Sequence, residues 1–327
     1  MYNHILIDVA NLFYRLAANA TTGEEAARKM VNWTKNEAMT RLSPDGRLYL
    51  LFDPMSYSDL GENKSFYVSL SPRKALLPDY KAGRKYSKIY SHAVELYRKY
   101  YIYRNIAVLI YSREYEADDY VEPLLKKLKK ESDTFCAALI TTDYDWARYI
   151  ENGDNYKVEM INNSWDKPYT VKDFVEDFEF HPTIAANSVY RAFFGDVSDN
   201  IEGAINIKKA KFVNNVKVLI RDYLKFVSDS GATVSDVLKQ FKTANFSAIN
   251  AKEDKSAFDY LYTELYIASL KAPVIEKFCT NLKVICSQLS DSDIEQYIHN
   301  NEDRPEVNNI IHQGLFGISF SSQFGRL

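Results

Sequence analysis

The stretch that decides the fold lies near the N-terminus and reads Ile5-Leu6-Ile7-Asp8-Val9. A short apolar run that carries a carboxylate at its end is typical of a buried strand whose last residue reaches a functional edge. Similar apolar runs occur at residues 48–52, 106–110 and 135–141, and longer amphipathic stretches separate them. This alternation predicts an α/β fold with a central, mostly parallel sheet flanked by helices.

The pattern changes beyond residue 187, where the strand signals fade. Residues 211–226 and 254–270 have the apolar periodicity of amphipathic helices. We therefore predict two parts, an α/β domain over residues 1–185 and a mainly helical domain over residues 186–327.

Composition narrows the class of protein. The 327 residues are 46% hydrophobic and 26% charged, which is typical of a soluble globular chain. The chain begins without a basic leader and contains no apolar stretch long enough to span a membrane. Its cysteines, Cys136, Cys279 and Cys286, form no CxxC pair, so we expect neither a disulfide framework nor a zinc site. These features favour a reducing, cytoplasmic location.

Acidic residues gather where the predicted strands end and helices begin. The carboxyl ends of parallel strands lie at the same edge of a sheet, so side chains placed there face one crevice. The acids in such positions are Asp8, Asp53, Glu116, Asp118, Asp119, Asp143, Asp145, Asp196 and Asp199.

Two interpretations of these acids compete. Any one of them could simply cap a helix N-terminus, and for a single residue the two interpretations are equally good. The full set in one cleft would repel strongly unless cations compensated the charge, and oxygen ligands without histidine or cysteine select a hard ion. We therefore predict two Mg²⁺ ions, for which Mn²⁺ would substitute. The tighter site is assigned to Asp8, Asp53, Glu116, Asp118 and Asp119, and the second, partly through water, to Asp143, Asp145, Asp196 and Asp199.

Residues 73–104 combine many basic side chains with seven tyrosines. Basic groups neutralise phosphates and aromatic rings stack on unpaired bases, so this mixture indicates single-stranded or frayed nucleic acid. The alternative is a helix whose tyrosines pack on the core, which we favour for a single residue such as Tyr97. The net charge of −3 is low for such a partner. It becomes positive when the nine metal-assigned carboxylates are set aside.

Five motifs occur in a fixed order: Ile-Asp-Val-Ala-Asn-Leu from residue 7, with Arg15; Asp-Tyr-Lys-Ala-Gly-Arg at 79–84; Tyr-Glu-Ala-Asp-Asp at 115–119; Thr-Thr-Asp-Tyr-Asp at 141–145; and Gly-Asp-Val-Ser-Asp-Asn-Ile-Glu-Gly at 195–203. Together they resemble the motifs of the 5′ nuclease family, which includes flap endonucleases and phage 5′ exonucleases. The chain is closest in appearance to the ribonuclease H type of T-even bacteriophages.

The resemblance implies a PIN-like core and 5′–3′ exonuclease or flap endonuclease activity on branched DNA or RNA–DNA, with removal of RNA primers and flaps in phage replication. It also implies a threading arch over residues 73–104. Lys81 and Arg84 would be catalytic. The residues expected to bind nucleic acid are Tyr80, Arg15, Lys85, Lys208, Lys209 and Lys211.

One departure follows Gly203, where the family has a glycine-rich helix-hairpin-helix. Asn206 and Lys208 stand at positions where glycines are expected, so we predict a degenerate motif in which lysines grip the duplex instead.

The expected partners are flapped, forked or nicked DNA and RNA–DNA, bound by a monomer in the cytoplasm of an infected bacterial host. A sliding clamp, through residues 313–316 and Phe320, or a single-strand-binding protein is a further hypothesis. For residues 313–316 and Phe320 we favour the alternative, an apolar tail that packs on the domain. Two alternatives stay open: a branched-DNA scaffold without cutting activity, and a PIN-like single-strand ribonuclease. A phosphatase would need Asp-x-Asp at Asp8, where Ala10 stands instead.

Overall fold

The computed structural model describes residues 1–54, 71–81, 87–112, 114–162, 164–205, 213–268, 273–286 and 289–299. The first half of the chain contains β1 (Tyr2–Asp8), α1 (Val9–Ala17), α2 (Gly23–Trp33), β2 (Leu42–Leu51), α3 (Pro72–Leu76), α4 (Lys88–Arg104), β3 (Val108–Ile110), α5 (Ala117–Lys130), β4 (Phe135–Ile140), the 3₁₀ turn η4 (Tyr144–Tyr149), β5 (Glu151–Asn152) and β6 (Tyr156–Ile161). The remainder contains α6 (Val171–Phe178), α7 (Ile184–Phe194), β7 (Gly195–Asp196), β8 (Ile201–Glu202), α8 (Val213–Asp229), α9 (Val234–Thr243), α10 (Phe246–Asn250), α11 (Ala257–Ala268), α12 (Pro273–Ile285) and β9 (Ile298–His299).

A seven-stranded sheet forms the centre, in the order β5-β6-β4-β1-β2-β3-β9. Strand β1 lies in the middle and pairs in parallel with both β2 and β4, whereas the edge strands β5 and β9 are antiparallel. The chain runs from β1 to β2 and β3 on one side and then crosses to β4 and β6 on the other. Crevices at such a reversal of strand order, beside the carboxyl ends, are the usual ligand sites of open parallel sheets.

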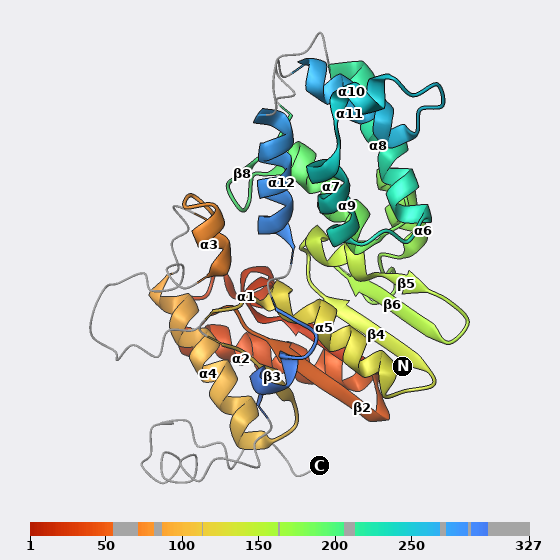
Figure 1. Cartoon of the computed structure of the whole chain (residues 1–327). Coiled ribbons are helices and arrows are strands. Elements are labelled where there is room, and N and C mark those ends of the chain that lie inside the picture. The colour runs from red at the N-terminus through yellow and green to blue at the C-terminus, as the bar shows by residue number, and fades with distance from the viewer. Residues whose placement is uncertain are drawn as a thin grey trace, which may run out of the picture.

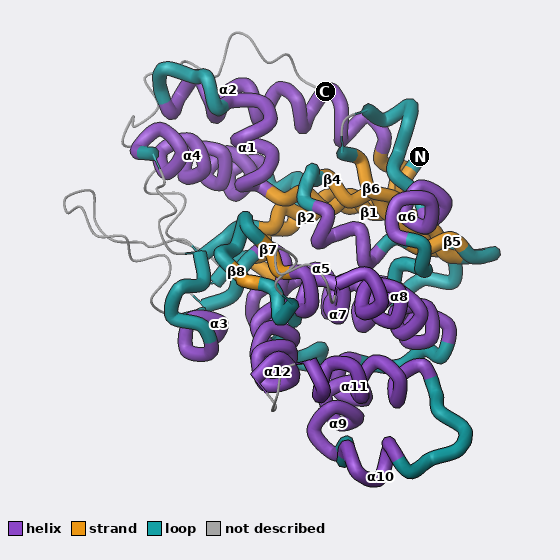
Figure 2. Tube along the Cα trace, turned by 90° about the horizontal axis from the view of Figure 1, so that it is seen from above, coloured by secondary structure: helices purple, strands orange, loops and turns teal. Residues whose placement is uncertain are grey.

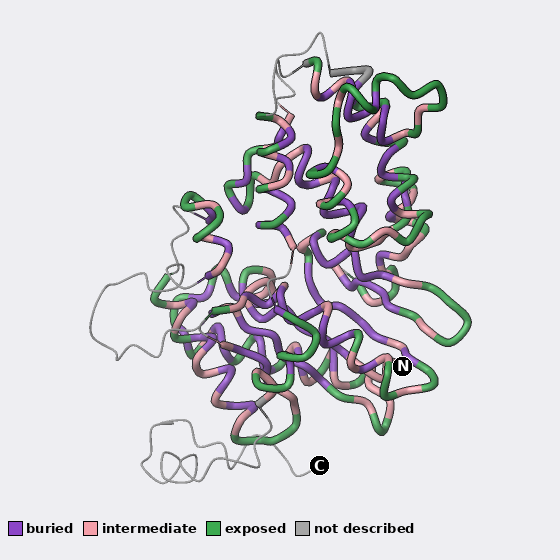
Figure 3. The backbone as a smooth tube through the Cα atoms, viewed as in Figure 1, coloured by how far each residue is buried: buried purple, intermediate pink, exposed green. Residues whose placement is uncertain are grey.

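Helices cover both faces of this sheet. Figure 2 shows α1, α2 and α4 on one side of the strands and α5, α7 and α8 on the other. The alternating side chains of β1 serve both layers, because Ile5 and Ile7 belong to the core under α1, α2 and α4, while Leu6 belongs to the opposite core. A continuous apolar run is therefore required of β1, and the central strands are largely buried (Figure 3).

The helices α7 to α12 lie together on the α5 side of the sheet (Figure 1). Aromatic rings join them: Phe193 of α7 stacks on Phe278 of α12 with ring centroids 4.2 Å apart, and Phe241 of α9 lies 4.5 Å from Phe278. These rings belong to the same core as the α5 face of the sheet. After α12 the chain returns to the sheet, where β9 pairs with β3. Residues on both sides of the predicted boundary at 185/186 therefore share one core, and the division of the chain into two domains stays a prediction.

The predicted fold class is confirmed: the sheet is central and mostly parallel, and the later part is mainly helical. All four predicted strands exist, but β2 begins at Leu42, ahead of the predicted start, because the polar residues Pro44, Asp45 and Gly46 gave the local pattern of a turn. Strands β5, β6 and β9 were not predicted. Within the part of the chain that is described, no helix has the length and apolar character needed to cross a membrane.

The predicted arch over 73–104 is only partly described, since residues 82–86 lie outside the described ranges. Its second half is α4, which packs on α2 and the sheet. Tyr90, Tyr97, Tyr100 and Tyr101 of this helix are all buried in that core. The alternative interpretation, in which Tyr97 packs on the core, is confirmed, and these four rings are not presented to bases.

Candidate metal centre

Side-chain hydrogen bonds join the ends of β1 and β4 at the reversal of strand order. Asp8 caps α1, since its Oδ1 accepts a hydrogen bond from the N–H of Asn11 at 3.0 Å. Its Oδ2 accepts the hydroxyl of Thr141 at 3.2 Å. Asn11 and Thr142 exchange two further hydrogen bonds, of 2.8 and 3.0 Å, across the same gap. Asp8 is thus held in a fixed orientation between the two strand ends.

The N-terminus of α5 lies beside the end of β2. Asp53 follows β2, and its Oδ1 accepts the N–H of Ala117 in the first turn of α5 at 3.2 Å. Glu116 and Asp119 cap the same helix by a reciprocal pair of side-chain to backbone hydrogen bonds. The capping interpretation therefore holds for these acids, but a cap uses one carboxylate oxygen and leaves the other for a second partner.

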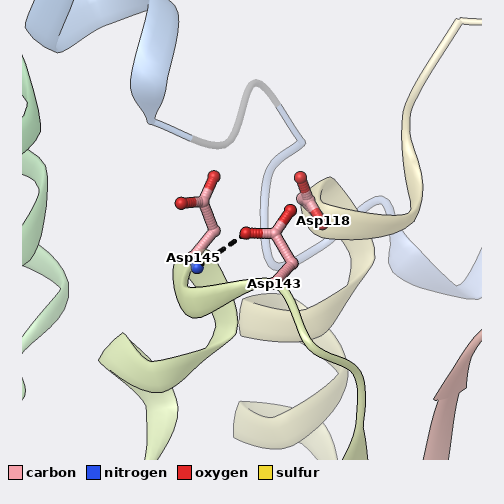
Figure 4. A group of neighbouring side chains, drawn as sticks. All are labelled: Asp118, Asp143 and Asp145. Carbon is pink, nitrogen blue, oxygen red and sulfur yellow. Dashed lines mark hydrogen bonds between the residues drawn. The ribbon is translucent and has the colours of Figure 1, made fainter. Parts of the chain in front are cut away.

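Asp118, Asp143 and Asp145, which we call the turn group, form a cluster at the start of α5 and η4 (Figure 4). Asp143 caps η4 by accepting the N–H of Asp145 at 2.9 Å. The indole N–H of Trp146 donates to Asp118 at 2.5 Å. One oxygen from each of the three carboxylates lies within 4.8 Å of the others, which is compatible with a shared divalent cation.

Asp196 and Asp199 lie on the β7–β8 hairpin, whose shape requires two glycines. Gly195 has φ of +83°, and a Cβ there would lie 2.4 Å from the backbone nitrogen of Gly203. A Cβ on Gly203 would lie 2.6 Å from a backbone carbonyl oxygen at the end of α7. The hairpin therefore packs closely on α7, and it brings Asp196 and Asp199 to within 4.8 Å of Asp145. We call Asp145, Asp196 and Asp199 the hairpin group.

An open cavity of about 750 Å³ lies over these carboxylates. Its charged lining residues are Asp8, Asp53, Lys81, Asp118, Asp143, Asp145, Arg191 and Asp196. Tyr14, Tyr144, Phe178 and Tyr190 add aromatic side chains to the lining. Six of the nine predicted carboxylates therefore meet in one cavity, and the other three, Glu116, Asp119 and Asp199, are buried beside it.

Those three buried acids have basic partners. Arg73 donates to Glu116 at 2.7 Å and to Asp119 at 2.6 Å. Lys81 donates to Glu116 at 2.7 Å, and its ammonium lies 3.8 Å from Asp199. Burial alone would raise the pKa of Glu116, but Lys81 and Arg73 hold it at about 2. The structure thus gives Glu116 and Asp119 salt bridges in addition to their caps.

The cavity side of the cluster carries unbalanced negative charge. Burial, followed by the charges of Asp53 and Asp118, raises the pKa of Asp8 to about 8. Burial, followed by Asp145 and Asp118, raises the pKa of Asp143 to about 8, and burial raises that of Asp53 to about 6. Such shifts mean that the nearby basic groups do not fully compensate these carboxylates in their ionised forms. Oxygen-only donors that need positive charge fit a hard divalent ion.

Arg191 is a site residue that the sequence did not single out. It lies in the last turn of α7 and forms ion pairs with Asp145 and Asp196. Its position in that turn, directly before the acidic hairpin, is the signal that could have identified it. Arg73 and Arg148 are also buried beside the cluster, and no local pattern marks them as buried.

The structure assigns Tyr80 a different role from the predicted one. Its side chain is only 1% exposed, and its hydroxyl oxygen lies within hydrogen-bond distance of Glu116, at 2.8 Å, and of Asp199, at 3.1 Å. The predicted stacking of this ring on a terminal base is therefore wrong for this conformation, because the ring is part of the core. Arg15 lies over the ring of Trp33, 5.0 Å from its centroid, and outside the cavity lining.

Several predicted residues lie outside the described ranges. They are Arg84, Lys85, Lys208, Lys209, Lys211 and the C-terminal residues 313–316 and Phe320. Their roles, and the degenerate helix-hairpin-helix after Gly203, stay predictions.

No protein-family model and no curated protein matches this chain. Among solved structures, the chain is similar to the bacteriophage T5 D15 protein co-crystallised with metal ions, with 20% identity, coverage of 86% of this chain and 99% of that one, and a TM-score of 0.49. It is also similar to T5 5′-exonuclease with bound zinc, at 19% identity, 86% and 99% coverage and a TM-score of 0.46. A third is the T5 D15 flap endonuclease in a pseudo-enzyme-product complex with DNA and metal ions, at 18% identity, 88% and 100% coverage and a TM-score of 0.46. These solved structures are thus those of a phage protein described as a 5′-exonuclease and as a flap endonuclease.

Proposed function

We propose that this protein is a divalent-metal-dependent hydrolase that cuts phosphodiester bonds near the 5′ end of branched DNA or RNA–DNA, as a 5′–3′ exonuclease and flap endonuclease. The observation that carries this proposal is the convergence of six carboxylates and Lys81 on one open cavity. All of these residues except Asp53 come from motifs that resemble those of 5′ nucleases. Acids that were simply scattered over the surface would not gather at the ends of three strands and in one hairpin.

The donor set favours Mg²⁺, with Mn²⁺ able to replace it. The turn group would hold one ion, with Asp8 and Asp53 beside it, and the hairpin group offers oxygens for a second. When bound, such ions supply an activated water and stabilise the charge on the leaving oxygen. Within this mechanism no side chain has to act as a nucleophile.

Lys81 is positioned for the scissile phosphate. Its ammonium lines the cavity while donating to Glu116, and its backbone has the left-handed φ of 52°. The backbone N–H of Lys81 donates to the carbonyl of Asp199 at 2.9 Å, so the β7–β8 hairpin determines where the side chain lies. A phosphate that enters the cavity would be attracted by this ammonium. The attraction would increase as negative charge develops on the phosphoryl oxygens, so Lys81 would stabilise the transition state more than the bound substrate.

The finer assignments follow from the sequence motifs. They are a preference for flapped, forked or nicked substrates, removal of RNA primers and flaps in phage replication, action as a monomer, and a cytoplasmic location in an infected bacterium. A sliding clamp or single-strand-binding protein as partner is the least supported of these proposals.

The test is cleavage of a 5′-labelled flap substrate in Mg²⁺ and in EDTA by the wild type and by the Asp118→Asn/Asp143→Asn double variant. Asparagine caps helices as well as aspartate does, so this change removes charge while keeping the cap of η4. Asp173→Asn is the matched control, because Asp173 caps α6 away from the cavity.

Metal-dependent cutting near the junction that only the double variant loses, with unchanged circular dichroism, would support the proposal. Equal cutting by the double variant and the control would mean that these acids serve only as helix caps. Tight flap binding by the wild type without cutting in Mg²⁺ or Mn²⁺ would indicate a branched-DNA scaffold, and cutting of linear RNA alone would indicate a PIN-like ribonuclease.

A further inference from the structure

The two carboxylate groups differ in whether a basic side chain already occupies them. In the hairpin group, Arg191 forms an ion pair with Asp145 through one terminal nitrogen and with Asp196 through the other. The third member, Asp199, lies 3.8 Å from the ammonium of Lys81. All three acids of the hairpin group therefore have a described cation within ion-pair distance.

The turn group is different. Among the described residues, no lysine or arginine lies within salt-bridge distance of Asp118 or Asp143, and the same holds for their neighbours Asp8 and Asp53. Arg191 pairs with Asp145, the residue that the two groups share. Within the described residues, the turn group thus has a basic partner only at Asp145, whereas every member of the hairpin group has one.

The burial of Arg191 and its permanent charge stabilise these two ion pairs. Its side chain is 11% exposed, as are those of Asp145 and Asp196, so water screens the two ion pairs poorly. The guanidinium is planar and cannot lose its charge, and it fits two carboxylates at once. Because α7 leads directly into the hairpin, Arg191 and Asp196 are also close in the sequence.

We infer that the guanidinium of Arg191 takes the place of a second divalent ion in the hairpin group, so that this protein binds one ion tightly in the turn group and a second only when Arg191 is displaced. This inference rests on the proposed metal site and specifies its stoichiometry. Arg191 acts here as a positioning residue, since it orients Asp145 and Asp196 and competes with the second ion.

The experiment is Mn²⁺ titration of the metal-free, DNA-free protein, with bound ions counted by calorimetry and free Mn²⁺ followed by electron paramagnetic resonance. The wild type should bind one ion, with the second weaker by about tenfold or more, because an adjacent positive charge opposes a divalent cation. Arg191→Met should tighten the second ion by about tenfold or more. Arg191→Lys, which keeps the charge, should leave it weak.

Arg191→Gln serves as a second neutral variant in case Arg191→Met does not fold, and Arg221→Met is the control, because Arg221 pairs with Glu179 at the surface. Two ions of equal affinity in the wild type, or a second ion that neither neutral variant tightens, would overturn the inference. Failure of the wild type and of every variant to bind any Mn²⁺ would instead contradict the proposed function, which depends on a bound divalent ion.

Discussion

Replacing Arg73 with Met tests whether charge neutralisation holds the buried side of the acidic cluster. The Arg73 side chain is 3% exposed and bonds to Glu116 and Asp119 at 2.7 and 2.6 Å. Removing one partner of a buried pair typically costs about 3–5 kcal/mol, because the other charge stays buried. Glu116 keeps Lys81, whereas Asp119 loses its salt bridge to Arg73. We therefore expect the free energy of unfolding to fall by about 3 kcal/mol, near the lower end of that range.

The assay is urea unfolding in EDTA at pH 8, followed by circular dichroism. Arg221→Met is the control, since the side chains of Arg221 and Glu179 are 44% and 55% exposed. Exposed pairs contribute roughly 0–1 kcal/mol, so the control should barely shift the urea midpoint. A loss for Arg73→Met no larger than that of the control would refute the reasoning.

The pH dependence supplies an independent check on the same variant. Arg73 and Lys81 lower the pKa of Glu116 to about 2, from an ordinary value of 4.5. A carboxyl group with a lowered folded pKa stabilises the fold above its unfolded pKa and loses that contribution as the pH falls. The difference between wild type and Arg73→Met should therefore be full at pH 8 and should shrink as the pH drops below 4.5. A difference that stays constant down to the acid limit would exclude Glu116 as its source.

Three further predictions concern the cavity. Lys81→Ala should lower the single-turnover cleavage rate more than it weakens flap binding, because the ammonium faces charge that develops during the reaction; equal losses in both measurements would remove Lys81 from the chemistry. Mg²⁺ should raise Tm in calorimetry more at pH 8 than at pH 6, because the pKa of Asp8 and of Asp143 is about 8 and both must lose protons to bind the ion. A Mg²⁺ shift that does not change with pH would contradict this expectation. In EDTA those raised values make the folded state bind protons more tightly than the unfolded state, so Tm should fall as the pH rises towards 8, and a Tm in EDTA that stays constant over this range would contradict that second expectation. Gly203→Ala should lower the free energy of unfolding by about 1–3 kcal/mol, since the new Cβ would lie 2.6 Å from a carbonyl oxygen; Gly153→Ala, whose nearest atom is 3.8 Å away, should be neutral in the same urea titration.

Both interpretations of the acids proved useful, because capping and convergence are not exclusive. Asp8 caps α1 with one oxygen while it lines the cavity, and Asp143 does the same at η4. The signal for the site was therefore the placement of several acids at successive strand ends rather than the character of any one. Tyr80 shows the limit of this reasoning, because an aromatic residue between basic ones has the same local pattern whether its ring is exposed or buried.

The sequence by itself determined the strands β1 to β4 and the edge of the sheet at which the acids gather. Apolar runs such as the one ending at Asp8 are local, and the parallel order follows from the helices between them. Only the tertiary structure decided how charge is divided among those acids, for Arg73 and Glu116 are 43 residues apart and Arg191 meets Asp145 across the α7–η4 contact. Such pairs depend on packing between elements distant in the chain, which local periodicity does not encode. The burial of Tyr80 and the return of β9 to the sheet were decided in the same way.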